Sequence, residues 1–155
     1  MINVSGPQIE VEPPEGWRVD EALEAWFAAV DPAPTDGFAA NAVVLCDRIR
    51  SDVPLDEYAA ANLRELQGIC QSVAVRQHNG GDGFLDRVLV MERDGVSVVQ
   101  YQRFLLYSSA VTDKVHWLVQ IQASCPQAEE PRFAPVFGRF VSGVKVTAPT
   151  GRGQS

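Results

Sequence analysis

The chain has 155 residues, of which 13 are Lys or Arg and 20 are Asp or Glu, so its formal net charge is −7, and 46% of its residues are apolar. This composition is typical of one folded domain and excludes a disordered chain. We place that domain at residues 1–147 and expect a flexible tail at 148–155, which has little to bury. An acidic balance disfavours nucleic-acid binding, because affinity for phosphates depends on Lys and Arg.

Features of secretion and of membrane proteins are missing from the sequence. Residues 1–7 have neither a basic region nor the apolar run that a secretory signal needs. No stretch reaches the roughly 18 apolar residues of a membrane span. Cys46, Cys70 and Cys125 are widely spaced and lie in apolar surroundings, which favours reduced core thiols over a zinc site or a disulfide. We therefore expect a cytoplasmic protein without a membrane span.

The negative charge is concentrated in the N-terminal part of the chain. Residues 1–65 carry a net charge of −9 and residues 66–155 a net charge of +2. One interpretation is a solvated acidic surface without a ligand. The other is a docking surface for a basic protein partner.

The first half of the chain predicts two strands and at least one helix. Strands are expected at residues 8–12 and 41–49. Segment 17–30 can be interpreted as helix or strand, and its local propensity favours a helix. A helix is expected to begin after Pro54, because apolar residues recur at i, i+3, i+4 and i+7 over residues 55–70.

The second half predicts an antiparallel sheet followed by a helix. Strand-like runs occur at residues 72–76, 85–93, 96–108 and 115–124. Asp94-Gly95 predicts a type I′ hairpin, and the glycine-rich segment 79–83 predicts the turn before it. The last helix should follow Pro131 and stop at Gly143. Short connections make the sheet antiparallel, so the predicted fold class is α+β, with about six strands flanked by two main helices.

A polar centre is predicted on one face of the last two long strands. Its residues are Gln100, Gln102, Gln120 and Gln122, and it is flanked by Phe104, His116 and Leu118, which complete the candidate ligand or partner face. A loop centred on Val111 would pair Gln102 with Gln120 and Gln100 with Gln122. Amides among apolar groups suit a neutral, hydroxyl-rich ligand. The alternative is that these glutamines form the solvated side of an antiparallel sheet.

The inventory of catalytic groups is small. His78 and His116 lack the spacing of a metal pair and have no neighbouring Cys ligand. Cys125 follows His116 by nine residues, which is about 30 Å along a straight strand and too far for a nucleophile and its base. We therefore expect no enzyme, with no catalytic residue, metal or cofactor.

Short motifs spread over about residues 8–147 carry a resemblance to a known family. They are Pro14-Glu15-Gly16-Trp17, Gly37-Phe38-Ala39-Ala40-Asn41 followed by Ala42-Val43-Val44, Leu55-Asp56-Glu57-Tyr58, Trp117-Leu118-Val119-Gln120, and a closing helix over residues 133–146. The pattern resembles the PsbP-like fold, and most closely the actinobacterial LpqN/LpqT family.

This resemblance implies a fold and a class of function. The fold is an α/β/α sandwich in which residues 26–30 form a strand that pairs with residues 41–49. LpqN-like lipoproteins are associated with cell-envelope lipid transport, and related domains act as chaperones for secreted effectors in type VI systems. The present sequence has no lipidated cysteine near its start.

We predict a non-catalytic cytoplasmic module that binds a protein partner, which is basic if it docks on the acidic half. Its role would be that of a secretion accessory or chaperone, acting through a sheet face or through the acidic N-terminal part. The alternative is a binding protein of the LpqN type for a small ligand, a glycolipid or another hydroxyl-rich molecule, linked to cell-envelope lipid handling.

Overall fold

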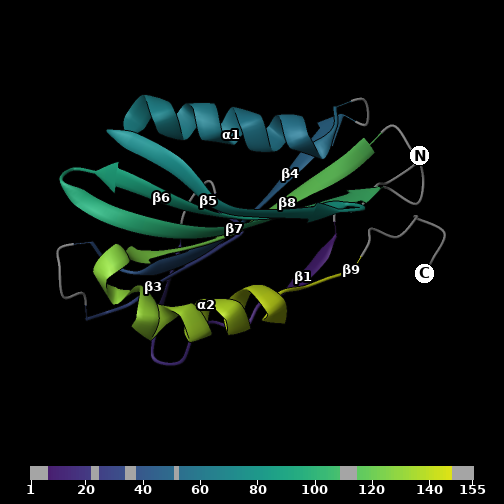
Figure 1. Ribbon diagram of the computed structural model, residues 1–155. Coiled ribbons are helices and arrows are strands. Elements are labelled where there is room, and N and C mark those ends of the chain that lie inside the picture. Colours follow the sequence, from purple (N-terminus) through teal and green to yellow (C-terminus); the bar gives the residue numbers. More distant parts are fainter. Residues whose placement is uncertain (1–6, 22–24, 34–37, 51–52, 109–114, 148–155) are drawn as a thin grey trace.

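The computed structural model describes residues 7–21, 25–33, 38–50, 53–108 and 115–147 (Figure 1). The strands are β1 (Gln8–Glu10), β2 (Arg18–Asp20), β3 (Phe27–Val30), β4 (Asn41–Arg50), β5 (Ser72–Gly81), β6 (Phe84–Arg93), β7 (Val96–Ser108), β8 (Val115–Pro126) and β9 (Lys145–Thr147). The helices are α1 (Leu55–Ile69) and α2 (Glu130–Gly143), and a short 3-10 helix, η1 (Gln127–Glu129), precedes α2.

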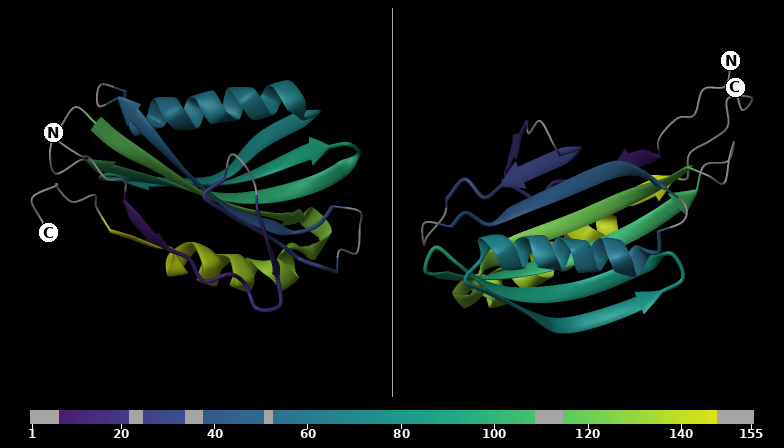
Figure 2. Two further views of the ribbon diagram at one scale, coloured as in Figure 1. Left: turned by 180° about the vertical axis from the view of Figure 1, so that it is seen from behind. Right: turned by 90° about the horizontal axis from the view of Figure 1, so that it is seen from above.

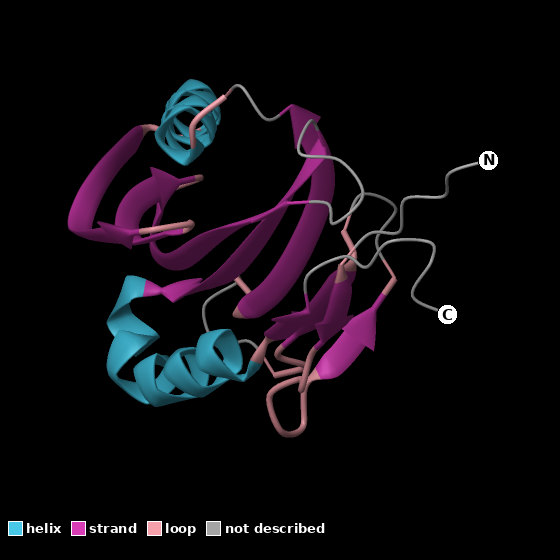
Figure 3. Cartoon of the chain, turned by 90° about the vertical axis from the view of Figure 1, so that its right-hand side faces the viewer, coloured by secondary structure: helices cyan, strands magenta, loops and turns pink. Residues whose placement is uncertain are grey.

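The strands form one large and one small antiparallel sheet. The large sheet has seven strands in the order β2-β3-β4-β8-β7-β6-β5, and β1 pairs with β9 in a two-stranded sheet. Helix α1 lies on one face of the large sheet and α2 on the other (Figure 3). The predicted α+β class and the α/β/α layering are confirmed, with more strands than the six expected.

Helix α1 forms where the apolar spacing predicted it. It begins after Pro54, and Asp56 and Glu57 in its first turn interact favourably with the helix dipole. Its apolar stripe lies on β6 and β7, where Ala59 packs against Leu85 and Phe104. Among the residues of α1, all of which the structure describes, only Ala59 is buried. The helix is therefore a cover on the sheet and not an element of the interior.

Helix α2 carries the aromatic face that fastens it to the sheet. Phe133, Phe137 and Phe140 are buried, and the rings of Phe133 and Phe137 stack with centroids 5.7 Å apart. The helix ends at Gly143 as predicted, so the helix over residues 133–146 that the resemblance implies is wrong at its end. Val146 instead pairs with Ile9 in the small sheet, so hydrogen bonds to β1 replace those of a further helical turn.

The segment before β4 is extended, although its local propensity favours a helix. The backbone N–H of Trp26 donates to the Val44 carbonyl at 2.9 Å, and β3 pairs with β4 over its whole length. Ala29 in β3 is fully buried. Burial against the sheet outweighs a propensity difference of about 0.5 kcal/mol per residue. The strand that the resemblance implies here is confirmed, and residues 22–24 lie outside the described residues.

Of the two turns predicted between β5 and β7, the structure confirms one and shortens the other. Asp94 and Gly95 have φ angles of 52° and 81°, which confirms the type I′ hairpin. The turn expected over residues 79–83 is shorter, because β5 continues to Gly81 and only Asp82 and Gly83 turn. Pairing with β6 extends β5 well beyond the predicted end, and a bulge at Arg76 interrupts the pairing.

Candidate functional site

The four predicted glutamines share one face of the sheet, but their register differs from the prediction. Gln102 lies opposite Gln122, and Gln120 lies opposite Phe104. The expected pairs Gln102–Gln120 and Gln100–Gln122 are therefore wrong by two residues. A shift of two residues leaves each side chain on its own face, so alternation predicts the face and leaves the register open.

Helix α1 divides the predicted polar centre into a covered part and an accessible part. Gln102, Phe104 and Leu118 are at most 3% exposed. The helix lies over β5, β6 and β7 and also packs on Leu118 of β8, while further along β4 and β8 no described helix lies above the strands on this side (Figure 2). The covered residues belong to the packing of α1, and they are inaccessible to a ligand in this structure.

A buried guanidinium that sequence reasoning missed completes the covered part. Arg87 is 6% exposed, and its Nε donates to Gln102 Oε1 at 2.6 Å while its Nη2 donates to Asn62 Oδ1 at 3.0 Å. Burial lowers the pKa of Arg87. A signal was present, because strand alternation in β6 places Arg87 on the same face as the buried residues Leu85 and Leu89.

The accessible part forms a surface that we call the open face. It comprises Val43, Leu45 and Asp47 of β4 and His116, Gln120 and Gln122 of β8. Leu45 lies opposite Gln120, and Val43 lies opposite Gln122, so apolar and amide side chains are neighbours across the strands. Trp26, just before β3, is 51% exposed. Its neighbour Phe27 stacks on Phe140 beneath the sheet, so alternation places Trp26 on the open side.

Two buried polar atoms at the start of β8 have no hydrogen-bond partner among the described residues. They are Nδ1 of His116 and Nε1 of Trp117. An unsatisfied buried donor or acceptor costs about 1–3 kcal/mol. The two residues are adjacent in the strand, so their side chains project to opposite faces, and His116 lies on the open face.

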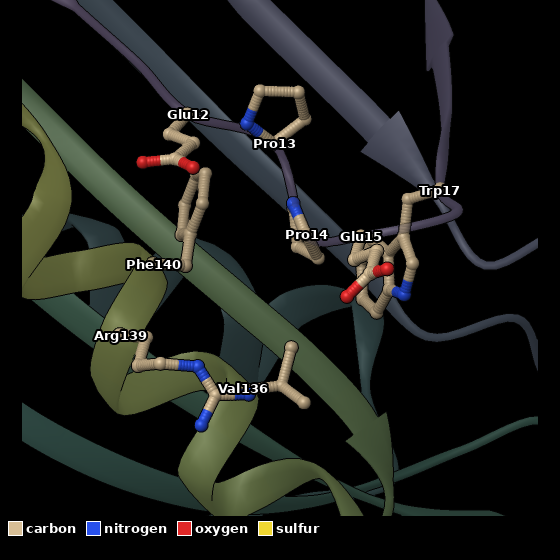
Figure 4. Close-up of a pocket in the computed structure, with 8 residues that line it drawn as sticks. All are labelled: Glu12, Pro13, Pro14, Glu15, Trp17, Val136, Arg139 and Phe140. Atoms are coloured by element: carbon tan, nitrogen blue, oxygen red, sulfur yellow. The ribbon is translucent and has the colours of Figure 1, made fainter.

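A larger concavity, which we call the N-terminal groove, lies between the segment that follows β1 and helix α2 (Figure 4). Its volume is about 630 Å³. The lining residues are Glu12, Pro13, Pro14, Glu15, Trp17, Val136, Arg139 and Phe140. Sequence reasoning missed this site, because the residues come from two ends of the chain.

A smaller concavity, the α2-side cavity, lies between α2 and strands β5 to β7. Its volume is about 280 Å³, and its polar lining includes Gln77, Asn79 and Ser142. Asp86 and Arg103 also line it and form a bidentate ion pair with distances of 2.8 and 2.9 Å. Tyr101 and Phe137 add aromatic surface.

The described residues supply little for catalysis. His78 on β5 and His116 on β8 are separated by two strands, about 14 Å across the sheet, and the register offsets them by six residues along it. Cys125 is fully buried, and this burial raises its pKa to about 12, which disfavours the reactive thiolate. No group of three or more metal-binding side chains occurs among the described residues. In the same part of the chain, neither helix has the length and apolar character to cross a membrane.

Comparisons with known proteins identify the fold. No protein-family model matches the chain, and no match is found among curated proteins. A structure of LpqN from Mycobacterium tuberculosis, described as involved in cell envelope biogenesis, matches with a TM-score of 0.68 and 16% identity over 95% of this chain and 91% of that one. Cyanobacterial PsbP from Synechocystis sp. PCC 6803 matches with a TM-score of 0.62 and 12% identity over 93% and 94%.

A third structure is a protein of unknown function and putative regulator from Pseudomonas aeruginosa. It matches with a TM-score of 0.55 and 14% identity over 79% of this chain and 92% of that one. The PsbP-like fold predicted from the short motifs is confirmed, with LpqN among the similar structures. At these identities the likeness concerns the fold alone.

Proposed function

We propose that this chain is a non-catalytic domain that binds a protein partner on its open face. The observation that carries the proposal is the surface of β4 and β8 beside α1, which neither described helix covers and where half-buried apolar side chains alternate with amides. Interfaces combine an apolar centre with polar groups that fix the orientation of the partner. This surface offers both, over strands whose other face is anchored in the core.

Two residues give the open face the character of an interface. Trp26 is half exposed, and tryptophan is enriched among the residues that dominate binding energy. The half-buried imidazole of His116 lies on the same face and adds a polar group to this surface.

The role that we propose is that of a secretion accessory or chaperone in the cytoplasm. The three cysteines are free thiols, which is typical of a reducing compartment. LpqN is described as involved in cell envelope biogenesis, and this supports a role linked to envelope or secretion machinery.

The test compares two exposed apolar side chains at different places. Proteins from a lysate of the source organism are captured on the wild-type chain, identified, purified and titrated individually. We expect Trp26→Ala to weaken the Kd of the true partner about tenfold or more. Ile69→Ala is the matched control, since Ile69 is 61% exposed at the end of α1. Equal affinities of both variants and the wild type would overturn the open face as the site.

A second candidate function is the binding of a small hydroxyl-rich ligand, favoured by the α2-side cavity. Amides, a hydroxyl and an ion pair surround an aromatic surface there, and these groups can donate and accept hydrogen bonds in several directions. The glutamines Gln100, Gln102 and Gln122 instead donate hydrogen bonds to other side chains. The cavity is therefore a better candidate for this ligand than the predicted amide cluster.

This second candidate is tested by thermal unfolding with octyl glucoside below its micellar concentration. A bound ligand raises the Tm as its concentration rises. We expect Asn79→Ala to reduce the rise and Gln67→Ala, on the exposed side of α1, to preserve it. An unchanged Tm at millimolar ligand would contradict the candidate.

A further inference from the structure

The wall of the N-terminal groove is fixed by local sequence. Pro13 and Pro14 restrict the backbone, and the N–H of Trp17 donates to the Pro14 carbonyl at 3.1 Å to close a turn. Gly16 has a φ of +80° in this turn. The Trp17 ring then meets Phe133 edge to face, with centroids 6.0 Å apart. An occupant would find this wall already ordered, which reduces the entropic cost of binding.

The groove combines an apolar lining with charges that have no partner in the described part of the chain. Glu12 and Glu15 lie on the N-terminal wall, and Arg139 lies on α2 (Figure 4). All three are exposed, and no hydrogen bond or ion pair joins their side chains to another described residue. Trp17, Val136 and Phe140 supply apolar surface between these charges.

We propose that the N-terminal groove binds an extended basic segment of a protein partner. An Arg or Lys side chain of the segment lies between the carboxylates of Glu12 and Glu15 and against the Trp17 ring. Guanidinium and ammonium groups are attracted both to carboxylates and to the face of an indole. An apolar side chain of the same segment contacts Val136 and Phe140. The inference rests on the proposed function in one respect, namely that the ligand is a polypeptide.

The charge of the groove selects this occupant over the alternatives. Two carboxylates and one guanidinium give its lining a net charge of −1, so an acidic segment would meet repulsion. A small alkylammonium ion would leave Arg139 and the apolar wall without contacts. A polypeptide presents carbonyl oxygens that accept hydrogen bonds from Arg139. The volume of about 630 Å³ lies in the range of ligand-binding clefts.

The acidic residues of the N-terminal part do not form one continuous patch. Glu57 and Glu65 lie on α1, on the opposite side of the sheet from Glu12 and Glu15 (Figure 1). These four carboxylates are therefore divided between two faces. This division provides a control, since neutralising two carboxylates on α1 changes the net charge equally and leaves the groove intact.

The test uses a short labelled peptide in which Arg and Leu alternate with Gly, together with versions that carry Lys or Glu in place of Arg. Binding to the full chain is followed by fluorescence anisotropy at low and high salt. We expect the Arg and Lys peptides to bind and the Glu peptide to bind about tenfold more weakly. Glu12→Gln with Glu15→Gln should weaken Arg-peptide binding about fivefold or more, and Glu57→Gln with Glu65→Gln less than about twofold.

A third variant separates the groove from general electrostatics. Val136→Lys places a cation in the groove and should abolish binding of the Arg peptide, while circular dichroism confirms that the fold is unchanged. Equal losses in both double variants, equal binding of the Glu peptide, or no binding at millimolar peptide would each overturn the inference. Loss of an identified partner through Trp26→Ala, with no effect of the Glu12 and Glu15 substitutions, would refute the groove and keep the open face. The reverse result would refute the open face.

Discussion

Arg87 brings a charge into the interior without a carboxylate among its hydrogen-bond partners in the described residues. Amide oxygens of Gln102 and Asn62 accept from its guanidinium, whose carbon lies 5.2 Å from the centre of the Phe104 ring. Each of these two amides therefore contributes to stability because it accepts a hydrogen bond from the buried guanidinium charge. A buried charge that loses one partner costs more than the hydrogen bond contributes in isolation.

This dependence predicts a coupling between Arg87 and Asn62. We expect Asn62→Ala to reduce the free energy of unfolding by about 1–3 kcal/mol in the wild type, and by much less in an Arg87→Met background, because no buried charge then lacks a partner. Urea unfolding of the four proteins measures the cycle. Equal costs of Asn62→Ala in both backgrounds would contradict the interpretation.

The backbone conformation of Gly16, in the wall of the N-terminal groove, leads to a separate prediction about stability. Its φ of +80° is a conformation that residues with a side chain rarely adopt, so Gly16→Ala should reduce the free energy of unfolding by about 1 kcal/mol. Gly68→Ala is the control, since Gly68 lies in α1 with open space at its Cβ position, and a stabilisation of up to about 1 kcal/mol is expected there. Urea unfolding distinguishes the two, and a stabilised Gly16→Ala would contradict the strain argument.

At the scale of elements, the bulge in β5 joins the sheet edge to α2. Arg76 stands at the bulge, and its side chain forms an ion pair with Glu130 in the first turn of α2. The Tyr101 hydroxyl of β7 donates to the same carboxylate at 2.8 Å. The Arg76 guanidinium is the main reason why the pKa of Glu130 is lowered. The bulge thus positions a residue that ties the edge strand to the helix on this face.

The lowered pKa of Glu130 predicts a pH dependence. A carboxyl whose pKa is lower in the folded state contributes stability above its unfolded pKa, and this contribution is lost as the pH falls through the folded pKa. We expect Glu130→Gln to reduce the free energy of unfolding at pH 7 by about 1 kcal/mol. The difference from the wild type should vanish in acid. Urea unfolding at neutral and acidic pH measures it, with Glu65→Gln as an exposed control, and a difference that persists in acid would contradict the assignment.

Local patterns predicted those elements whose environment is simple. The periodicity of α1, the alternation of β7 and the Asp94-Gly95 turn depend on residues that are close in sequence. The structure confirms all three. Segment 26–30 was predicted correctly only through the resemblance, because its propensity for helix is outweighed by pairing with β4. The end of β5 was mispredicted because residues 79–81, two of which are glycines, are held extended by pairing with β6.

The candidate site was likewise predicted correctly where local patterns determine the structure and incorrectly where contacts distant in sequence determine it. Alternation placed the four glutamines on one face, yet three of the predicted site residues, Gln102, Phe104 and Leu118, are covered by α1. A pattern in one strand carries no information about which part of the sheet a distant helix will cover. The N-terminal groove escaped prediction for this reason, since residues 12–17 meet α2 only in the folded chain.

At the scale of the whole molecule, the two helices cover different parts of the sheet. Helix α1 lies over β5, β6 and β7, whereas α2 packs mainly on β8 and β7 from the other side. This offset leaves the open face beside α1 and the α2-side cavity beside α2. The binding surfaces that we propose are therefore consequences of helix placement, and they need no irregularity in the sheet itself.

The strand order also has a consequence for the rate of unfolding. Within the groups β2 to β4 and β5 to β8, strands that are adjacent in the sheet are also consecutive in the chain. The two groups are joined by one pairing that is distant in sequence, between β4 and β8. Contacts that are distant in sequence form slowly, so we expect this seam to form late in folding and to open early in unfolding. The open face lies across the seam. A partner bound there would contact both halves and so prolong the lifetime of the folded state.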